Sequence, residues 1–351
     1  INILLNLFIE MLFSKNKDDV ANKILIIIII SSFFLGLVTA LTNTYGYDND
    51  TYRMLKTFLN LIHNGIYIPS RPPGSPVPEI GIGTLAWLGG SNLTNIFTLL
   101  IYFISISLFP FCFIKKPRYT NYLFFLTLCA TSPLLLFENT HSIDYSWALL
   151  FFTIGALIKF RFNYNYISIV FFVLAVASRC IYILYLIPLI IFNSNDEHHV
   201  KFEQKISFLF TCLFCSTLFY LPVWFQNNLS LNWITTHTPD DEGLFGIMAR
   251  FIYKNIMNFG LIQSIIIAFI FLNNFLKDNI KSWIIEKKLL SLLGIIILNL
   301  IVFLKIPGEP MYLQITVIST FFILAFCLKL KNLNFYLLFI VIFFNIFSWF
   351  K

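Results

Sequence analysis

Residues 24–42 read ILIIIIISSFFLGLVTALT, an apolar run without a single charged side chain. An α-helix needs about 20 such residues to cross the hydrocarbon core of a bilayer. Similar runs recur along the chain, so the sequence predicts an all-α polytopic membrane protein with about 10–12 transmembrane helices. The other runs are 94–114, 121–137, 144–160, 206–225, 257–276, 289–304, 311–328 and 333–350.

The composition points the same way. Hydrophobic residues make up 58% of the 351 residues and charged residues 12%, with a mean hydropathy of +0.81. Soluble domains carry about 25% charged residues, so an ordinary cytoplasmic domain, a disordered chain and a disulfide-rich secreted scaffold are excluded. The net charge of +7 sits in short clusters between apolar runs, which indicates no nucleic-acid partner. The 42 Phe residues are expected to face lipid.

The segment 164–192 allows two interpretations, because Arg179 lies at its middle and Pro188 follows. With a cytoplasmic N-terminus, a hairpin of two short helices leaves 16 of the 24 Lys and Arg residues inside and 8 outside. A single crossing leaves 12 inside and 11 outside, with Arg179 within the bilayer. Basic residues favour cytoplasmic loops, and a mid-membrane Arg costs about 2.5–3.5 kcal/mol. We therefore predict the hairpin, with Arg179 at the outer surface.

The chain then forms one integral-membrane domain, 1–351, whose outer loops are few and chemically dense. The first outer loop, 43–93, holds DND at 48–50 and GIYIPSRPPGSPVPE at 65–79, and a second large outer loop covers 226–256. The density of Pro and Gly predicts a turn-rich path that keeps side chains of the first loop in fixed positions. A carboxylate pair followed by a rigid segment with Arg and Glu suits group transfer at a lipid phosphate.

These two motifs, DNDTYRM and GIYIPSRPPGSPVPE, resemble the first outer loop of the GT-C superfamily of integral-membrane glycosyltransferases, of the protein mannosyltransferase and lipid A aminoarabinose transferase type. The resemblance implies a GT-C fold with a structured first outer loop. It also implies transfer of a sugar, a hexose or a pentose, from a polyprenyl-phosphate-linked donor to a glycan, lipid or protein acceptor. It places Asp50 on the catalytic carboxylate and Asp48 on the acidic position before it. The chain departs at Thr51, where many relatives have Glu, so no metal ligand is assigned and participation of a divalent metal stays open.

The expected site follows from this chemistry. Inverting transfer needs a carboxylate that takes the acceptor's proton and cations that hold the departing phosphate. We expect Asp50, with Asp48, in the first role, and Arg71, Arg179 and Lys305 in the second, because Arg can bond two phosphate oxygens at once. Other outer polar residues are expected to contact the substrates: Arg53, Glu79, His141, Asp144, Glu309 and Tyr312.

Several of these residues have a structural alternative. Asp50, Glu79 and Asp144 each precede or open an apolar helical run and could cap a helix. Arg71 could be a surface charge, His141 a structural residue, and Tyr312 an anchor at the membrane interface.

Two other functions compete with a glycosyltransferase. An O-antigen polymerase or ligase also handles polyprenyl diphosphates outside, but typically through Arg and His in a large late loop. A flippase or transporter of a polyprenyl-linked glycan would more often show internal repeats and broken helices in two matched halves, which the sequence lacks. The heavy use of Ile, Phe, Asn and Lys suggests an AT-rich genome, and we expect a bacterial inner membrane with the site facing the periplasm.

Overall fold

The computed structural model describes residues 18–46, 49–71, 73–192, 201–226, 243–277, 287–305, 310–327 and 332–348, and all its regular elements over these ranges are helical. The first half comprises α2 (Asp18–Thr42), α3 (Asn49–Asn64), α4 (Pro76–Leu108), η1 (Phe109–Cys112), α5 (Tyr119–Thr131), α6 (Pro133–Glu138), α7 (Tyr145–Leu157), η2 (Ile158–Phe162) and α8 (Asn165–Ser178). The second half comprises α9 (Tyr182–Phe192), α10 (Phe202–Gln226), α11 (Leu244–Phe259), α12 (Leu261–Lys277), α14 (Lys287–Lys305), η4 (Pro310–Leu313), α15 (Gln314–Phe322), η5 (Ile323–Cys327) and α16 (Asn332–Phe347).

Four of the described helical stretches are long and apolar enough to cross a membrane, or five if one bent pair counts as a span. The four are Asn22–Thr42, Pro76–Cys112, Tyr145–Phe162 and Phe202–Phe225. The bent pair joins Phe245–Phe259 to Leu261–Asn273 at 91°. This is fewer than the 10–12 expected, because apolar composition alone does not distinguish a spanning helix from a shorter buried one.

The segment 164–192 shows where the difference arises. The structure has two helices here, α8 with 14 residues and α9 with 11, separated at Arg179. At 1.5 Å per residue they are about 21 and 17 Å long, shorter than the roughly 30 Å hydrocarbon core. Neither helix crosses a bilayer of ordinary thickness alone.

α4 is also divided. Gly89 and Gly90 leave helical geometry, and Gly90 has φ +67°, a conformation that glycine adopts without steric cost. The residues before the break form a short helix next to α3, and those after it form the apolar helix expected near 94–114. The long window Pro76–Cys112 therefore joins two differently placed helices.

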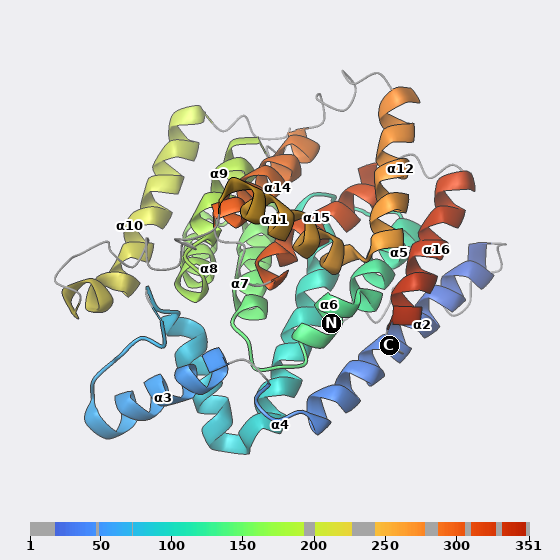
Figure 1. Cartoon of the computed structure of the whole chain (residues 1–351). Helices are drawn as coiled ribbons and strands as arrows, with labels where there is room; N and C mark the ends of the chain where they lie inside the picture. Colours follow the sequence, from blue (N-terminus) through green and yellow to red (C-terminus); the bar gives the residue numbers. More distant parts are fainter. Residues whose placement is uncertain are drawn as a thin grey trace.

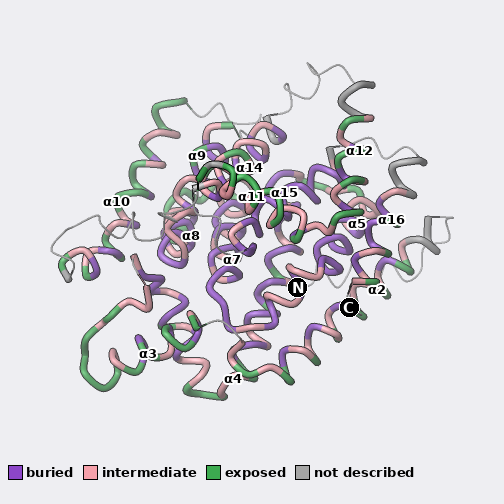
Figure 2. The backbone as a smooth tube through the Cα atoms, in the orientation of Figure 1, coloured by how far each residue is buried: buried purple, intermediate pink, exposed green. Residues whose placement is uncertain are grey.

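The core lies around α5, α7 and α15, while α3 and α10 carry exposed faces (Figures 1 and 2). Aromatic rings fill much of it: Phe109 stacks on Phe125 with centroids 6.1 Å apart, and Phe322 meets both edge-on. The expectation that Phe serves as lipid-facing bulk is thus wrong for these residues, which are fully buried.

α7 and α8 run antiparallel, and the two ends of this helix pair carry different polar residues. Asp144 directly precedes α7 and bonds to Arg179, which directly follows α8. At the opposite ends of these helices, Arg161 donates a hydrogen bond to the backbone carbonyl of Lys115. One end of the pair therefore carries mixed acidic and basic groups, and the other carries basic ones.

Candidate functional site

Asp144 is the centre of a cluster of charged residues. Its side chain is fully buried; Oδ1 accepts from Arg179 Nη1 at 2.7 Å and Oδ2 from Arg71 Nη2 at 2.9 Å. The Ser75 hydroxyl donates to Oδ2 at 3.3 Å. Burial disfavours the charged carboxylate, but the guanidinium groups of Arg179 and Arg71 outweigh burial and hold the pKa of Asp144 below its usual value. Asp144 is therefore a buried, ionised residue that positions two arginines, and its expected contact with substrate stays a prediction.

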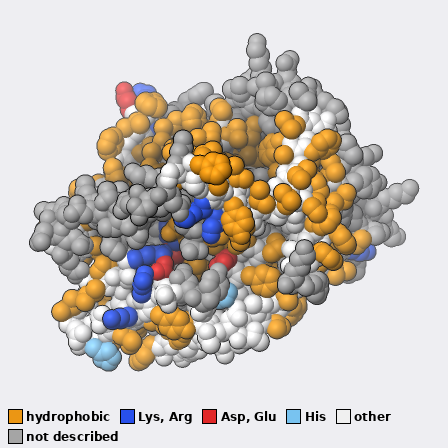
Figure 3. All heavy atoms as spheres, in the orientation of Figure 1, with side chains coloured by type: hydrophobic (Ala, Val, Ile, Leu, Met, Phe, Trp, Pro, Cys, Tyr) orange, Lys and Arg blue, Asp and Glu red, His pale blue; other side chains and the backbone are white. Residues whose placement is uncertain are grey.

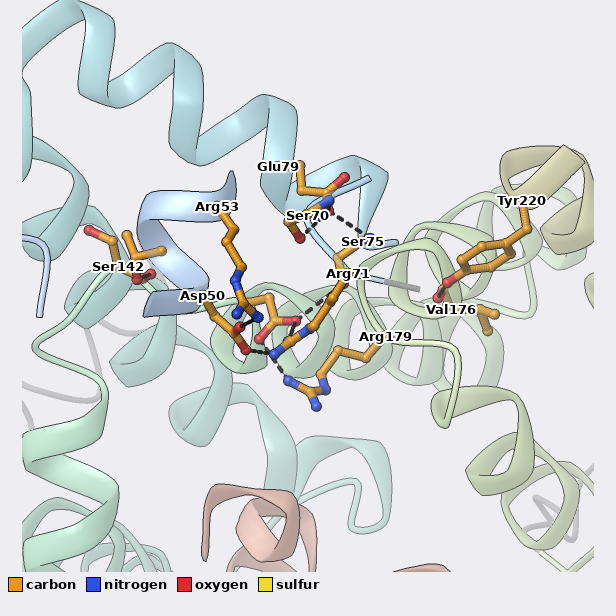
Figure 4. Close-up of polar contacts among 12 residues, drawn as sticks. Asp50, Arg53, Ser70, Arg71, Ser75, Glu79, Ser142, Val176, Arg179 and Tyr220 are labelled. Atoms are coloured by element: carbon orange, nitrogen blue, oxygen red, sulfur yellow. Dashed lines mark hydrogen bonds and ion pairs between the residues drawn. The ribbon is translucent and has the colours of Figure 1, made fainter. Parts of the chain in front are cut away.

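Asp50 lies at the edge of this cluster, in the first turn of α3. Its carboxylate pairs with Arg71 Nη1 through Oδ2 and with Arg53 Nη1 through Oδ1, the latter at 3.3 Å. The Asp50 side chain keeps 19% of its surface exposed, whereas that of Arg53 keeps 58%. Arg71 thus bridges one buried and one accessible carboxylate. Figure 4 shows the side chains of Asp50 and Arg71 pointing toward each other from different segments.

Two tyrosines line Arg179. The guanidinium carbon lies 3.6 Å from the centroid of the Tyr145 ring and 5.2 Å from that of Tyr312. A guanidinium over an aromatic face is stabilised by the ring quadrupole, most strongly when water is excluded. Burial opposes the charge on Arg179, but Asp144 and then the tyrosines raise its pKa above the ordinary value. Tyr312 was expected to contact substrate, and the structure places it against Arg179.

Glu79 holds the loop that carries Arg71. It is fully buried, and its Oε1 accepts from the Ser70 backbone N–H at 2.9 Å and the Ser75 backbone N–H at 3.2 Å. The hydroxyls of Ser70 and Tyr67 also donate to this carboxylate. Burial first, and Glu79 second, raise the pKa of Tyr67. The structure therefore gives Glu79 a capping and loop-anchoring role, because its carboxylate is enclosed and has no exposed surface for substrate.

The segments that carry Asp50 and Asp144 are tied together. Thr51 Oγ1 donates to the Ser142 carbonyl at 2.7 Å, and the Ser142 hydroxyl lies 2.6 Å from both Thr94 Oγ1 and Asn95 Oδ1. The loop 139–144 is thereby bonded to α3 and α4. These hydrogen bonds fix the segment that carries Asp50 relative to the segment that carries Asp144.

Capping does not explain Asp144. Although it precedes α7, its side chain makes no capping hydrogen bond. His141 lies against Asn43, with Asn43 Nδ2 3.1 Å from His141 Nε2. It does not belong to the set of residues that bond Asp144. Burial lowers the pKa of His141.

Three expected residues cannot be placed. Asp48 and Glu309 lie outside the described residues, as does the side chain of Lys305, the last residue of α14. Most of the predicted second outer loop, 226–256, also lies outside the described residues; from Leu244 onward it is part of helix α11, which continues to Phe259. Among the described residues no group of three or more His, Cys, Asp and Glu side chains could hold a metal ion.

The sequence reading missed Ser75 and Tyr145. Ser75 stands just before PVPE, where the sequence predicted turns and a possible helix cap at Glu79, and Tyr145 adjoins Asp144. Their contacts with Asp144 and Arg179 depend on segments far apart in the chain, so no local pattern identifies them. Basic and acidic side chains also gather near the middle of the face in Figure 3, bordered by hydrophobic ones.

Comparison with known proteins gives no match: no protein-family model, no curated protein and no solved structure matches the chain.

Proposed function

We propose that this protein is a membrane-embedded glycosyltransferase of the GT-C type that transfers a sugar from a polyprenyl-phosphate-linked donor to a glycan, lipid or protein acceptor. The proposal takes the site to face the non-cytoplasmic side, the periplasm in a bacterium. The observation that carries it is the arrangement of Asp50 and Arg71, a partly exposed carboxylate directly beside a guanidinium held in place by Asp144.

This arrangement supplies the two groups that the reaction requires. The acceptor hydroxyl oxygen attacks the anomeric carbon and the bond from that carbon to the phosphate oxygen breaks, with its electron pair leaving on the phosphate. Asp50 accepts the proton of the hydroxyl. Arg71, with Arg179 beside it, stabilises the negative charge that grows on the phosphate.

The surroundings of the cluster also favour a lipid-linked substrate. The cluster lies at the start of the candidate span Tyr145–Phe162 and at the end of α8. In the proposed orientation this end lies at the bilayer surface, where the phosphate of a lipid-linked donor is found. At the opposite end, η2 follows α7 and carries Lys159 and Arg161, and such basic residues favour a cytoplasmic face by the positive-inside rule.

The test is an analysis of lipid-linked saccharides in cells that lack the protein. We expect one polyprenyl-phosphate sugar to accumulate and to return to normal when the wild-type chain is restored. Asp50→Asn should insert into the membrane in normal amounts and fail to restore it. Glu203→Gln, which removes an exposed carboxylate from α10, is the matched control and should restore it fully. No accumulation in the deletion strain, or full rescue by Asp50→Asn, would refute the proposal.

A further inference from the structure

Asp50 and Arg71 are paired with each other, although the proposed reaction uses one as a proton acceptor and the other as a phosphate ligand. We infer that Asp50, by pairing with Arg71, covers the phosphate-binding position of Arg71 and that an incoming phosphate group displaces it. The inference rests on the proposed function and adds an order of events to it. The donor must bind before the carboxylate is able to accept a proton.

Of the two carboxylates on Arg71, Asp50 is the one that can exchange. Asp144 is fully buried and accepts hydrogen bonds from Arg71, Arg179 and Ser75. Removing it from its partners would leave buried charges without compensation, which is strongly unfavourable. Asp50 is partly exposed and belongs to α3, so its side chain can turn away while the buried part of the cluster stays intact.

The exchange keeps every charge paired. Arg71 bonds Asp50 through Nη1 and Asp144 through Nη2, so a phosphate oxygen can replace Asp50 at the first nitrogen while the second keeps its bond. Guanidinium groups accommodate carboxylate and phosphate oxygens with the same planar set of donors. Asp50 also lies 3.3 Å from Arg53, a solvent-exposed cation that stays beside the carboxylate once it has left Arg71.

The loop that carries Arg71 stays in place during this exchange. Glu79 bonds Ser70, directly before Arg71, and Ser75, four residues after it, and is itself fully buried. The guanidinium therefore stays in place when its partner changes. The structural change that we infer is a rotation of the Asp50 side chain.

The experiment measures binding of undecaprenyl phosphate to the purified full chain in lipid nanodiscs. Removing the competing carboxylate should tighten binding, so we expect Asp50→Asn and Asp50→Ser each to bind about 5- to 10-fold more tightly than wild type. Glu203→Gln changes net charge equally, far from the cluster, and should bind as wild type does. In an Arg71→Gln background the Asp50→Asn effect should vanish, because the two residues act through one contact.

Inorganic phosphate as a competitor distinguishes the two sources of the anion. If it displaces undecaprenyl phosphate and shows the same increase in affinity with Asp50→Asn, the phosphate group alone displaces Asp50. If it does not compete, the lipid chain is part of recognition. Unchanged or weaker binding of undecaprenyl phosphate by both folded Asp50 variants overturns the inference. Sugar transfer is read separately, so tighter binding with retained transfer would support displacement and refute the role of Asp50 as base.

Discussion

Asp144 Oδ1 lies 2.7 Å from Arg179 Nη1, which joins the residue before α7 to the residue after α8. Both partners are largely removed from water, and Arg71 shares the same carboxylate. The strength of the cluster therefore depends on a single buried acid that compensates two buried cations.

Asp144→Asn tests this dependence. The variant leaves Arg71 and Arg179 without their shared counter-charge, and loss of one member of a buried pair costs about 3–5 kcal/mol. Thermal unfolding in detergent should show a correspondingly large loss of stability. Ser75→Ala, the control, removes a longer hydrogen bond to the same carboxylate and should cost about 1 kcal/mol. An equal loss of stability in the two variants would contradict the central role of the Asp144 charge in the cluster.

The pH dependence of stability follows from the lowered pKa of Asp144. In the unfolded chain this carboxyl titrates near its ordinary value of about 3.9, and in the folded chain it titrates lower. Its contribution is therefore complete above about pH 4–5 and is lost as the pH falls through the folded pKa. The difference in unfolding temperature between wild type and Asp144→Asn should be constant near neutrality and shrink below pH 4. A difference in unfolding temperature that grows on acidification would contradict a lowered pKa of Asp144 in the folded chain.

Glu79→Gln tests the anchoring of the Arg71 loop. The amide keeps one acceptor but turns an NH₂ group toward surrounding donors, and hydrogen bonds to charged groups are worth about 1.5–3 kcal/mol. We expect destabilisation of that size and faster proteolysis between α3 and α4. Glu203→Gln, on an exposed site, should stay within about 0.5 kcal/mol of wild type. Wild-type stability of Glu79→Gln would show that the buried charge has no anchoring role.

Gly83→Ala tests the packing of α3 on α4. A Cβ at this position would overlap the Phe58 side chain, so α3 must move. Overpacking of this kind costs about 1–3 kcal/mol, and the shift should weaken the Asp50–Arg71 contact. Gly243→Ala, which meets nothing within 4 Å, should be neutral. Calorimetry should show a lower unfolding temperature for Gly83→Ala and an unchanged one for Gly243→Ala.

The sidedness of the cluster can be tested with two introduced cysteines. Ile66, 54% exposed, lies between α3 and α4, and Tyr166, 87% exposed, lies at the start of α8. An impermeant maleimide added outside intact cells should label Ile66→Cys and spare Tyr166→Cys until the membrane is permeabilised. Arg179, which we expected at the outer surface, is less suitable because its side chain is 11% exposed. The reverse pattern would place the cluster in the cytoplasm.

Part of this site could be predicted from sequence. Asp50 and Arg71 both belong to the first outer loop that the sequence predicted, and its Pro-rich segment 65–79 indicated that Arg71 would be held in place; the contact between the two side chains is visible only in the structure. The sequence also predicted Asp144 and Arg179 as site residues. It did not predict that they contact each other, because that contact depends on the packing of α7 against α8. Glu79 was assigned to substrate because a sequence does not show whether a carboxylate is enclosed. Among the described residues, fewer helices are long enough to span a membrane than the sequence predicted, for a related reason: buried and lipid-facing helices have the same apolar composition.

The break at Gly89–Gly90 separates the helix that anchors Arg71 from the one that continues through η1. Two residues outside helical geometry interrupt the hydrogen-bond ladder, so bending there is easier than in an intact helix. Both halves contact α7 at Trp147: Gly81, before the break, lies against its ring, and the Phe97 ring, after the break, lies 5.4 Å from it between centroids. A bilayer that changes thickness and tilts the later half of α4 would therefore act on the segment that carries Asp144, because Thr94 and Asn95 in that half each lie 2.6 Å from the Ser142 hydroxyl.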